Sequence, residues 1–366
     1  MPARATDPTR SAHAILNLAA VGRNAHRISG WVPGAKLMAV IKANAYGHGL
    51  LRIARSLPAI DAFAVARTAE GLALREGGIC QRIAVLQGFT DADELESHRS
   101  AGLEPVIHSP WQVDLLEQAP PAKPLRIWLK LDTGMHRLGL MADQVGECLR
   151  RLEACPSVAP EIPLMSHLAS ADDLEDPQTS EQLARFEAAA CGAGETSLAN
   201  SAGLMAWERT RLSWVRPGIT LYGVSPFPDR SGVDEGLEPV MTFRSRLISI
   251  KQLEPGAKVG YGGSWICPQR ARLGIVAVGY GDGYPRHAES GTPVLIRGQR
   301  LPLVGRVSMD MISVDVTHCP EARVGDPVTL WGDGLPVEEI ARCAHTIAYE
   351  LLCGVTARVR IIETDH

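Results

Sequence analysis

Short apolar runs alternate with helical stretches between residues 37 and 216, and this alternation restricts the fold more than any other feature of the sequence. Near-continuous apolar runs of this length are typical of strands that are buried on both faces of a parallel sheet. Eight strands alternating with helices predict an α/β fold, a (β/α)8 barrel of the TIM type, although a doubly wound sheet produces a similar alternation. The eight runs are Leu37–Ile41, Ala62–Ala66, Arg82–Gln87, Glu104–His108, Leu125–Asp132, Ile162–Leu168, Thr196–Asn200 and Ser213–Arg216.

The pattern changes after residue 240. Met241–Leu253 alternates apolar and polar residues, which is typical of a half-exposed strand. Further strand-like segments follow, with turn sequences between them. They are Leu273–Gly279, Pro293–Ile296, Met311–Val316, Val328–Trp331 and Ala357–Ile362, interrupted by one expected helix at Val337–Cys343. A chain of 366 residues has room for two domains, so we expect a barrel domain over residues 1–240 and a mainly β domain over 241–366.

Composition argues against several classes of protein. The net charge is −4 and no basic stripe occurs, so binding to nucleic acid is not expected. No apolar run approaches the roughly 18 residues of a membrane helix, and Met1–His13 lacks the apolar stretch of a signal peptide. The eight cysteines are scattered and form no C-x-x-C pair, which favours reduced thiols in a cytoplasmic protein. No histidine pair has metal-ligand spacing, so no catalytic metal is expected.

Lys42 directly follows the first apolar run and is followed by small residues. Lysine at a strand end usually emerges into solvent. The alternative is a lysine in a dry pocket that forms a Schiff base with a carbonyl compound. Lysine supplies only six of the 37 basic residues, so its position here carries weight.

Polar residues follow several of the other expected strands. Arg137 follows the fifth run, His167 ends the sixth, Ser201 follows the seventh, and Arg216 ends the eighth. In a TIM barrel all of these positions lie at the carboxyl face, where active sites are found. Ser201 and the backbone amides near Gly218 and Ile219 would suit a phosphate, because the loops after strands 7 and 8 commonly bind one.

Lys130 lies inside the fifth apolar run. Its side chain either extends between helices to reach solvent or is buried. A buried ammonium group would be costly unless it were paired or neutralised.

The run Val40–Gly49 resembles the pyridoxal-phosphate lysine motif of the alanine racemase family. Other motifs resemble those of the family in the same order and cover nearly the whole chain. They are Trp128–Gly139, Met165–His167, Ala199–Ala202, Arg216–Gly223, Val259–Gly262, Gly279–Tyr284, Gly305–Asp310 and Thr346–Leu352. The resemblance implies a homodimer whose active sites are shared between one chain's barrel and its partner's β domain. It also implies that the segment near Ala12–Leu18 joins the β domain.

The resemblance further implies interconversion of L-alanine and D-alanine with pyridoxal 5'-phosphate as cofactor, for peptidoglycan synthesis or for alanine catabolism. Lys42 and Tyr261 of the partner chain would be the two bases, on opposite faces of the cofactor–substrate plane. The implied cofactor-binding residues are Lys42, Tyr46, His167, Ser201, Arg216, Gly218, Ile219 and Tyr349. The implied substrate-binding residues are Arg137 and Met309. Tyr280, Asp310 and Tyr349 would narrow the entrance, and the residue at Lys130 is carbamylated in several family members.

Three other functions fit parts of the sequence less well. A decarboxylase of the same fold would have an acidic residue in place of Arg216 and a cysteine motif that is not found here. A cofactor-carrying protein with a lone barrel would not need the β domain with Tyr261, Met309 and Asp310. A broad-specificity racemase would be expected to carry an export signal.

Overall fold

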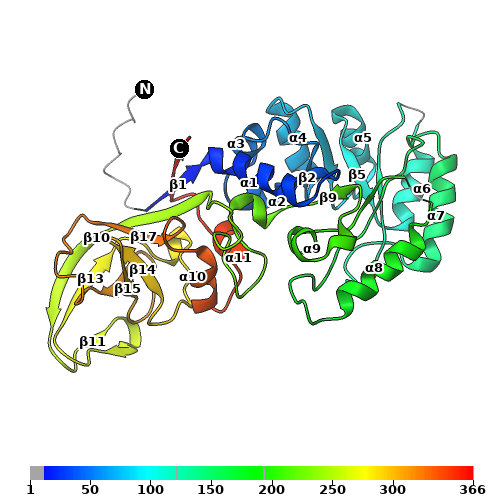
Figure 1. Ribbon diagram of the computed structural model, residues 1–366. Helices are drawn as coiled ribbons and strands as arrows, with labels where there is room; N and C mark the ends of the chain where they lie inside the picture. The colour runs from blue at the N-terminus through cyan, green and yellow to red at the C-terminus, as the bar shows by residue number, and fades with distance from the viewer. Residues whose placement is uncertain (1–11, 121–122, 193, 366) are drawn as a thin grey trace. The chain divides into compact units, whose positions relative to one another are not determined.

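The computed structural model describes residues 12–120, 123–192 and 194–365, which form two compact units (Figure 1). One unit spans Gly22–Leu221. The other combines the described residues up to Val21 with those from Tyr222 onward. The expected fold class, a TIM-type barrel with a second and mainly β domain, is confirmed.

The first unit is a closed barrel of parallel strands in the order β2 to β9. The barrel closes where β9 pairs with β2, with Lys36 opposite Trp214. Each of the eight apolar runs supplies one strand, and closure excludes the doubly wound sheet. The strands are β2 Lys36–Val40, β3 Ala62–Val65, β4 Arg82–Val85, β5 Glu104–Ile107, β6 Trp128–Lys130, β7 Leu164–Met165, β8 Thr196–Ser197 and β9 Trp214–Val215.

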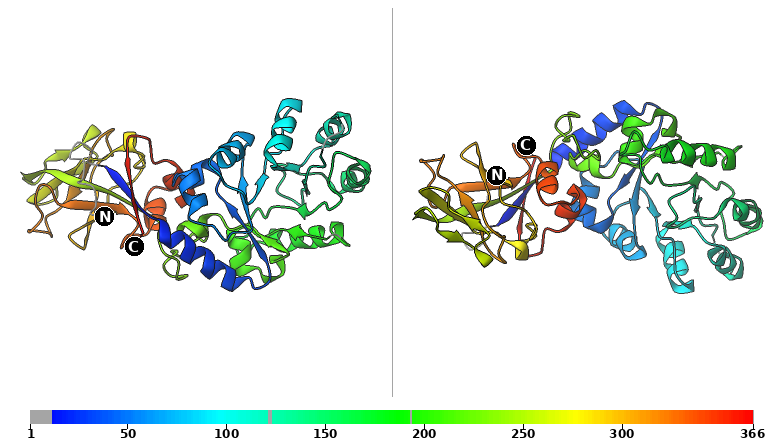
Figure 2. Two further views of the ribbon diagram at one scale, coloured as in Figure 1. Left: turned by 90° about the horizontal axis from the view of Figure 1, so that it is seen from above. Right: turned by 90° about the horizontal axis from the view of Figure 1, so that it is seen from below.

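Helices of this unit lie outside its strands (Figure 2). Their positions follow local signals in the sequence, such as the proline at the first position of α6 and the Asp91 side chain that accepts a hydrogen bond at the start of α5. The helices are α1 Leu18–Trp31, α3 Leu50–Arg55, α4 Thr68–Glu76, α5 Ala92–Ala101, α6 Pro110–Gln118, α7 Ala142–Ala154, α8 Gln178–Ala189 and α9 Ser201–Ala206. No helix in the described part of the chain combines the length and apolarity needed to cross a bilayer.

The second unit is built around the long strand β10, Met241–Leu253. Its main sheet has the order β15-β14-β17-β10-β1-β18, and β13 pairs with both β10 and β16. The other strands are β1 His13–Asn17, β11 Lys258–Val259, β12 Trp265–Ile266, β13 Ala271–Val276, β14 Pro293–Ile296, β15 Gln299–Pro302, β16 Ile312–Asp315, β17 Pro327–Trp331 and β18 Arg360–Thr364. Two helices, α10 Val337–Cys343 and α11 Ala348–Cys353, complete the unit.

Strand β1 lies between two strands that come much later in the sequence. It pairs antiparallel with β10, with His13 opposite Arg244, and parallel with β18, with His13 opposite Arg360. The amino-terminal segment therefore lies in the sheet of the second unit.

Residues 222–240 also lie in the second unit, whereas the sequence analysis assigns them to the barrel domain. The Glu338 carboxylate on α10 accepts hydrogen bonds from the backbone of Ser225 (2.8 Å) and Gly232 (2.7 Å). At the end of the segment, the Val240 carbonyl accepts a hydrogen bond from the Asn17 backbone over 2.8 Å. These contacts come from residues about 100 or more positions away, and local periodicity contains no signal for them.

Candidate active site

Lys42 begins a short turn of left-handed helix after strand β2. This element, α2 Lys42–Tyr46, has φ angles of +51° to +55° at its last four residues, none of which is glycine. A left-handed conformation costs an L-residue about 1–2 kcal/mol, so such a run persists only where surrounding contacts hold it. Backbone strain of this kind is concentrated at functional sites, and here it immediately follows the candidate Schiff-base lysine.

Glu70, in the first turn of α4, holds this turn in place. One carboxylate oxygen accepts a hydrogen bond from the Ala43 backbone over 2.7 Å. The other accepts bonds from the backbone of Ala66 (2.9 Å) and Arg67 (3.1 Å). A single carboxylate thus links the turn after β2 to the end of β3. The sequence analysis did not identify Glu70, since an acidic residue in a first helical turn is usually only a favourable charge at the helix dipole.

Tyr46, Ser201 and Gly218 meet at the ends of β2, β8 and β9. The Gly218 backbone donates to the Ser201 hydroxyl oxygen over 3.0 Å. A Cβ atom at Gly218 would lie 2.6 Å from the Tyr46 hydroxyl oxygen, so the close approach requires glycine. Ile219 follows at the start of the short 3-10 helix Ile219–Tyr222. Hydroxyls and backbone amides are groups that can hold a phosphate, and the phosphate site itself stays a prediction.

Thr220 also belongs to this group. It is fully buried, and its hydroxyl lies 3.1 Å from the Ser201 hydroxyl. The sequence analysis did not include Thr220 among the site residues, because a threonine in a Pro-Gly-Ile context carries no local signal of its own.

Arg216 connects the ends of strands β7, β8 and β9. It is 4% exposed and donates to the Ser197 hydroxyl (2.6 Å), the Ser166 carbonyl (2.6 Å) and the Leu198 carbonyl (3.2 Å). Burial lowers its pKa to about 10, so the guanidinium remains protonated at neutral pH. It also lies 3.3 Å from Nδ1 of His167. Burial, and next the charge of Arg216, hold the pKa of His167 well below its usual value, so this imidazole is neutral.

Lys130, at the end of β6, is 8% exposed. Burial, and next the positive charges of Arg216, Arg137 and Lys42, lower its pKa to about 7. A substantial fraction of this amine is therefore uncharged at neutral pH. Of the two possibilities that the sequence left open, the buried lysine is the observed one.

Arg137 lies on the loop between β6 and α7, which Asp132 organises. One carboxylate oxygen of Asp132 accepts hydrogen bonds from the backbone of Gly134 (2.9 Å), Met135 (3.1 Å) and His136 (3.1 Å). Burial alone would raise the pKa of Asp132, but these backbone bonds outweigh it and lower the pKa below its usual value. Arg137 is exposed and has no ion-pair partner among the residues that the structure describes. Its guanidinium is available to a carboxylate ligand.

The remaining predicted site residues lie in the second unit. Tyr280 and Met309 are brought together there, because the Tyr280 backbone donates to the Ser308 carbonyl (3.1 Å) and that of Gly281 to the Met309 carbonyl (2.9 Å). Asp310 forms an ion pair of 2.6 Å with Arg358, a partner that the sequence analysis did not identify.

Tyr261 and Tyr349 complete this set. Tyr261 begins the 3-10 helix Tyr261–Gly263 and is 67% exposed, which is high for an aromatic side chain. Tyr349 lies on α11 and is partly buried. The predicted site residues therefore form two sets, one at the carboxyl end of the barrel and one in the second unit.

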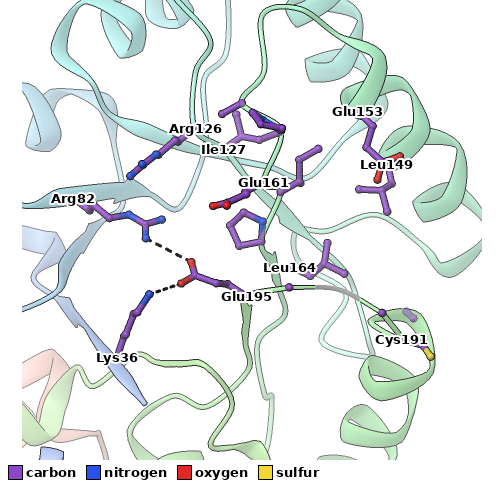
Figure 3. Close-up of a pocket in the computed structure, with 17 residues that line it drawn as sticks. Lys36, Arg82, Arg126, Ile127, Leu149, Glu153, Glu161, Leu164, Cys191 and Glu195 are labelled. Carbon is purple, nitrogen blue, oxygen red and sulfur yellow. Dashed lines mark hydrogen bonds and ion pairs between the residues drawn. The ribbon is translucent and has the colours of Figure 1, made fainter. Parts of the chain in front are cut away.

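A cavity of about 980 Å³ lies at the opposite, amino end of the barrel strands (Figure 3). Lys36 and Arg82, the first residues of β2 and β4, line it together with Glu195. Lys36 forms an ion pair of 2.5 Å with Glu195, and Arg82 one of 2.7 Å with Glu104. In TIM barrels this end contributes stability rather than catalysis. The cavity therefore lies away from the candidate site.

Fold and site together define a class of enzyme: a (β/α)8 barrel with a lysine and a cluster of hydroxyls and backbone amides at its carboxyl end, followed by a β domain. Family models for the alanine racemase N-terminal and C-terminal domains match residues 16–226 and 240–363. The chain belongs to the alanine racemase family, and it is an enzyme that interconverts L-alanine and D-alanine.

Three relatives illustrate the similarity. The alanine racemase of Nitrosococcus oceani is 51% identical over 94% of this chain and 97% of its own length. The crystal structure of the biosynthetic alanine racemase from Pseudomonas aeruginosa has a TM-score of 0.94 and 42% identity, covering 97% of this chain and all of that one. The crystal structure of the alanine racemase from Bartonella henselae with covalently bound pyridoxal phosphate has a TM-score of 0.86 and 29% identity. The match covers 97% of this chain and 99% of that one.

Proposed function

We propose that this enzyme racemises alanine with pyridoxal 5'-phosphate and two bases, Lys42 and Tyr261 of a partner chain. The observation that carries the proposal is the group of Tyr46, Ser201 and Gly218 at the same barrel end as Lys42, where a phosphate and a Schiff-base lysine are both needed. The relative from Bartonella henselae binds the same cofactor covalently.

The residues at the barrel end suit the separate parts of this cofactor. Lys42 would hold it covalently, and the hydroxyls of Tyr46 and Ser201 with the backbone of Gly218 and Ile219 would hold its phosphate. His167 and Arg216 would contact its ring. When bound, pyridoxal phosphate withdraws electrons from the substrate α-carbon and so makes the α-proton removable.

Inversion at the α-carbon needs a proton to leave one face and return to the other. One base is therefore not enough unless it moves between faces. The Lys42 amine would act on one face and the Tyr261 hydroxyl on the other. The high exposure of Tyr261, 67%, leaves its hydroxyl available to a second chain.

A homodimer is part of the proposal. Several large hydrophobic side chains of the second unit are exposed, among them Tyr261, Tyr280, Met309 and Met311 at 67%, 40%, 53% and 45%. Large apolar side chains that are left exposed in this number are typical of a surface that another chain covers. The partner's barrel is the surface that we propose.

Arg137 is the proposed ligand of the alanine carboxylate. Its guanidinium has no ion-pair partner within the described ranges, and an arginine can hold a carboxylate by two parallel hydrogen bonds. The Met309 backbone amide of the partner chain would assist it, and Tyr280 and Asp310 would narrow the entrance in favour of a small side chain.

We propose a biosynthetic role in the cytoplasm, supplying D-alanine for peptidoglycan rather than degrading alanine. The relative from Pseudomonas aeruginosa is a biosynthetic alanine racemase. No disulfide joins any of the eight cysteines, all of which lie in the described part of the chain, and this agrees with a reducing compartment.

To test this proposal, the pyridoxal-phosphate-loaded enzyme is incubated with L-alanine in D2O. NMR measures exchange of the α-proton, and a chiral assay measures the D-alanine formed. We expect exchange with accumulating D-alanine for the wild type. Tyr261→Phe should still exchange the α-proton of one enantiomer while losing racemisation. Borohydride reduction followed by peptide mass mapping should place the pyridoxyl group on Lys42.

Tyr284→Phe is the matched control, because Tyr284 is buried in the same unit as Tyr261 and lies outside the proposed site. It should racemise alanine like the wild type. Racemisation at the wild-type rate by Tyr261→Phe would assign the second base to another residue. A pyridoxyl group on a different lysine would overturn the role of Lys42.

A further inference from the structure

Gln182, on helix α8, is a fully buried glutamine whose amide oxygen and both amide hydrogens form hydrogen bonds. Its Oε1 accepts a hydrogen bond from the Ala169 backbone over 2.8 Å. Its Nε2 donates to the His167 carbonyl over 2.9 Å and to the Thr133 hydroxyl over 3.2 Å. Both hydrogens of the amide nitrogen and one lone pair of the oxygen are therefore used. The three partners lie on two different loops, which follow strands β6 and β7.

Two neighbours on the same face of α8 reinforce this connection. Gln178 donates to the Gly134 carbonyl over 3.0 Å, and its Oε1 accepts from the Ser170 hydroxyl over 2.7 Å. Arg185 donates to the Thr133 carbonyl over 2.9 Å. Positions 178, 182 and 185 are spaced by four and three residues, which places them on one helix face. This face holds both loops.

The two loops carry residues of the proposed site. Arg137 lies on the loop after β6, and His167 begins the loop after β7. The bond from Gln182 is made to the carbonyl of His167 itself. Thr133 continues the network, since its hydroxyl lies 2.8 Å from that of Ser166, whose carbonyl accepts from Arg216.

We propose that Gln182 is a positioning residue for racemisation: it sets the relative positions of the His167 backbone and the loop that carries Arg137. It contacts neither substrate nor cofactor in this proposal and acts only through those two residues. The inference rests on the proposed function, because it assumes that Arg137 binds the substrate and that His167 contacts the cofactor. A displacement of about 1 Å in such groups is enough to cost roughly a hundredfold in rate.

The same barrel contains a matched control. Gln112, on helix α6, is also fully buried, and it also bridges two neighbouring loops. Its Oε1 accepts from the His108 backbone over 2.8 Å, and its Nε2 donates to the Phe89 carbonyl over 3.0 Å. These loops follow β5 and β4 and contain none of the proposed site residues. Loss of Gln112 therefore unpairs buried backbone groups, as loss of Gln182 does, in loops that hold none of the proposed site residues.

The experiment compares Gln182→Met and Gln112→Met in the cofactor-loaded enzyme. Both variants should lower the melting temperature, because each leaves buried backbone groups unpaired. Gln182→Met should lower kcat/KM for alanine by about 10- to 100-fold, and Gln112→Met by less than about twofold. Hydrogen–deuterium exchange should accelerate at residues 132–139 and 167–171 in the first variant only.

A pH profile separates positioning from a general loss of stability. Gln182→Glu keeps the size of the side chain, and its protonated carboxyl can still donate to the His167 carbonyl, whereas its carboxylate cannot. Burial raises the pKa of such a carboxyl towards neutrality. The kcat/KM of Gln182→Glu relative to wild type should therefore fall as pH rises, and that of Gln182→Met should not. Arg185→Ala, which frees the Thr133 carbonyl and the exposed carboxylate of Glu181, should mainly raise KM.

Equal losses of kcat/KM in the two methionine variants would overturn the proposal and leave Gln182 with a structural role only. Unchanged exchange at residues 132–139 and 167–171 in Gln182→Met would overturn it as well, whatever the activity. Failure of the proposed function would look different from failure of this inference. The wild type would then lack pyridoxal-phosphate-dependent racemisation, while the two methionine variants would still differ in amide hydrogen–deuterium exchange.

Discussion

Nη2 of Arg216 lies 3.3 Å from Nδ1 of His167, and this contact assigns the protonation of the imidazole ring. Arginine has only donors, so Nδ1 of His167 must accept. The ring is neutral, and its single proton therefore lies on Nε2. Arg216 thus determines the tautomer of His167 and, through its charge, helps to lower the pKa of the ring.

Replacement of Arg216 by glutamine should raise the pKa of His167. The charge of Arg216 disappears, while burial, the larger cause, remains, so the pKa should stay below its usual value. A 15N NMR titration of the histidine rings measures the change. Arg209→Gln, which removes an exposed arginine paired with Glu187, is the control and should leave His167 unchanged. An unchanged titration in Arg216→Gln would mean that the arginine charge does not act on the ring.

Lys130 should react with carbon dioxide to form a carbamate, because its neutral amine is available near pH 7. The neutral nitrogen attacks the CO2 carbon and releases one proton to solvent, so a buried neutral amine becomes an anion close to Arg137. With 13C-bicarbonate, a carbamate resonance should appear in the wild type and be absent in Lys130→Arg. The exposed Lys251 provides the contrast, and Lys251→Arg should keep the signal. A bare amine in the wild type, with an anion bound beside it, would contradict the prediction.

In CO2-free buffer Lys130 should also make stability depend on pH. The folded state releases the proton near pH 7, whereas the unfolded state keeps it to about pH 10.5. The unfolded state binds more protons in this window, so the free energy of unfolding should rise with pH, by at most about 1.4 kcal/mol per pH unit. Lys130→Met should lack this contribution in denaturant titrations.

Gly218→Ala should weaken pyridoxal-phosphate binding and destabilise the barrel by about 1–3 kcal/mol, because the added Cβ would lie 2.6 Å from the Tyr46 hydroxyl oxygen. Tyr46→Phe removes that oxygen, so the same substitution should cost less in the Tyr46→Phe background. Cofactor titration and thermal unfolding of the four proteins give the coupling energy. Gly146→Ala, on α7 with open space around it, should be neutral or stabilising. Additive costs would show that the clash does not occur.

Loss of Glu104 should lower stability without changing the chemistry. Glu104 is 4% exposed, binds Arg82 through two hydrogen bonds of 2.7 and 2.9 Å, and accepts one of 3.0 Å from Trp128. Glu104→Ala removes the closer carboxylate partner of Arg82, leaves it the Glu195 carboxylate at 3.6 Å and takes the acceptor from Trp128, so it should cost about 1–3 kcal/mol. Because these residues lie at the amino end of the barrel, kcat should remain within about twofold.

Glu117→Ala is the surface counterpart, since Glu117 pairs with Arg151 in solvent and its loss should cost less than about 1 kcal/mol. Denaturant unfolding and kinetics on the same preparations test both variants. A large fall in kcat for Glu104→Ala would connect the amino end of the barrel to the reaction.

Much of this fold could be predicted from the sequence, because the signals are local. Each of the eight apolar runs forms a barrel strand, and Met241–Leu253, Pro293–Ile296 and Val337–Cys343 have the predicted bounds. Buried parallel strands and alternating half-exposed strands differ in periodicity within a few residues. The signals for Lys42 at a strand end and for the segment with Gly218 after the last barrel strand are equally local. The predicted roles of these residues remain predictions.

Other features depend on residues that are distant in the sequence. The sheet position of β1, the association of residues 222–240 with α10, the left-handed turn held by Glu70 and the two loops held by Gln182 are all set by long-range hydrogen bonds. A buried glutamine and an exposed one look alike in a sequence, and a carboxylate in a first helical turn does not indicate which backbone groups it will bind. The periodicity of apolar residues predicts which face of a helix or strand is buried. The roles of Glu70 and Gln182 depend instead on the groups that they bind. Only the closed barrel and the folded sheet bring such groups within hydrogen-bonding distance.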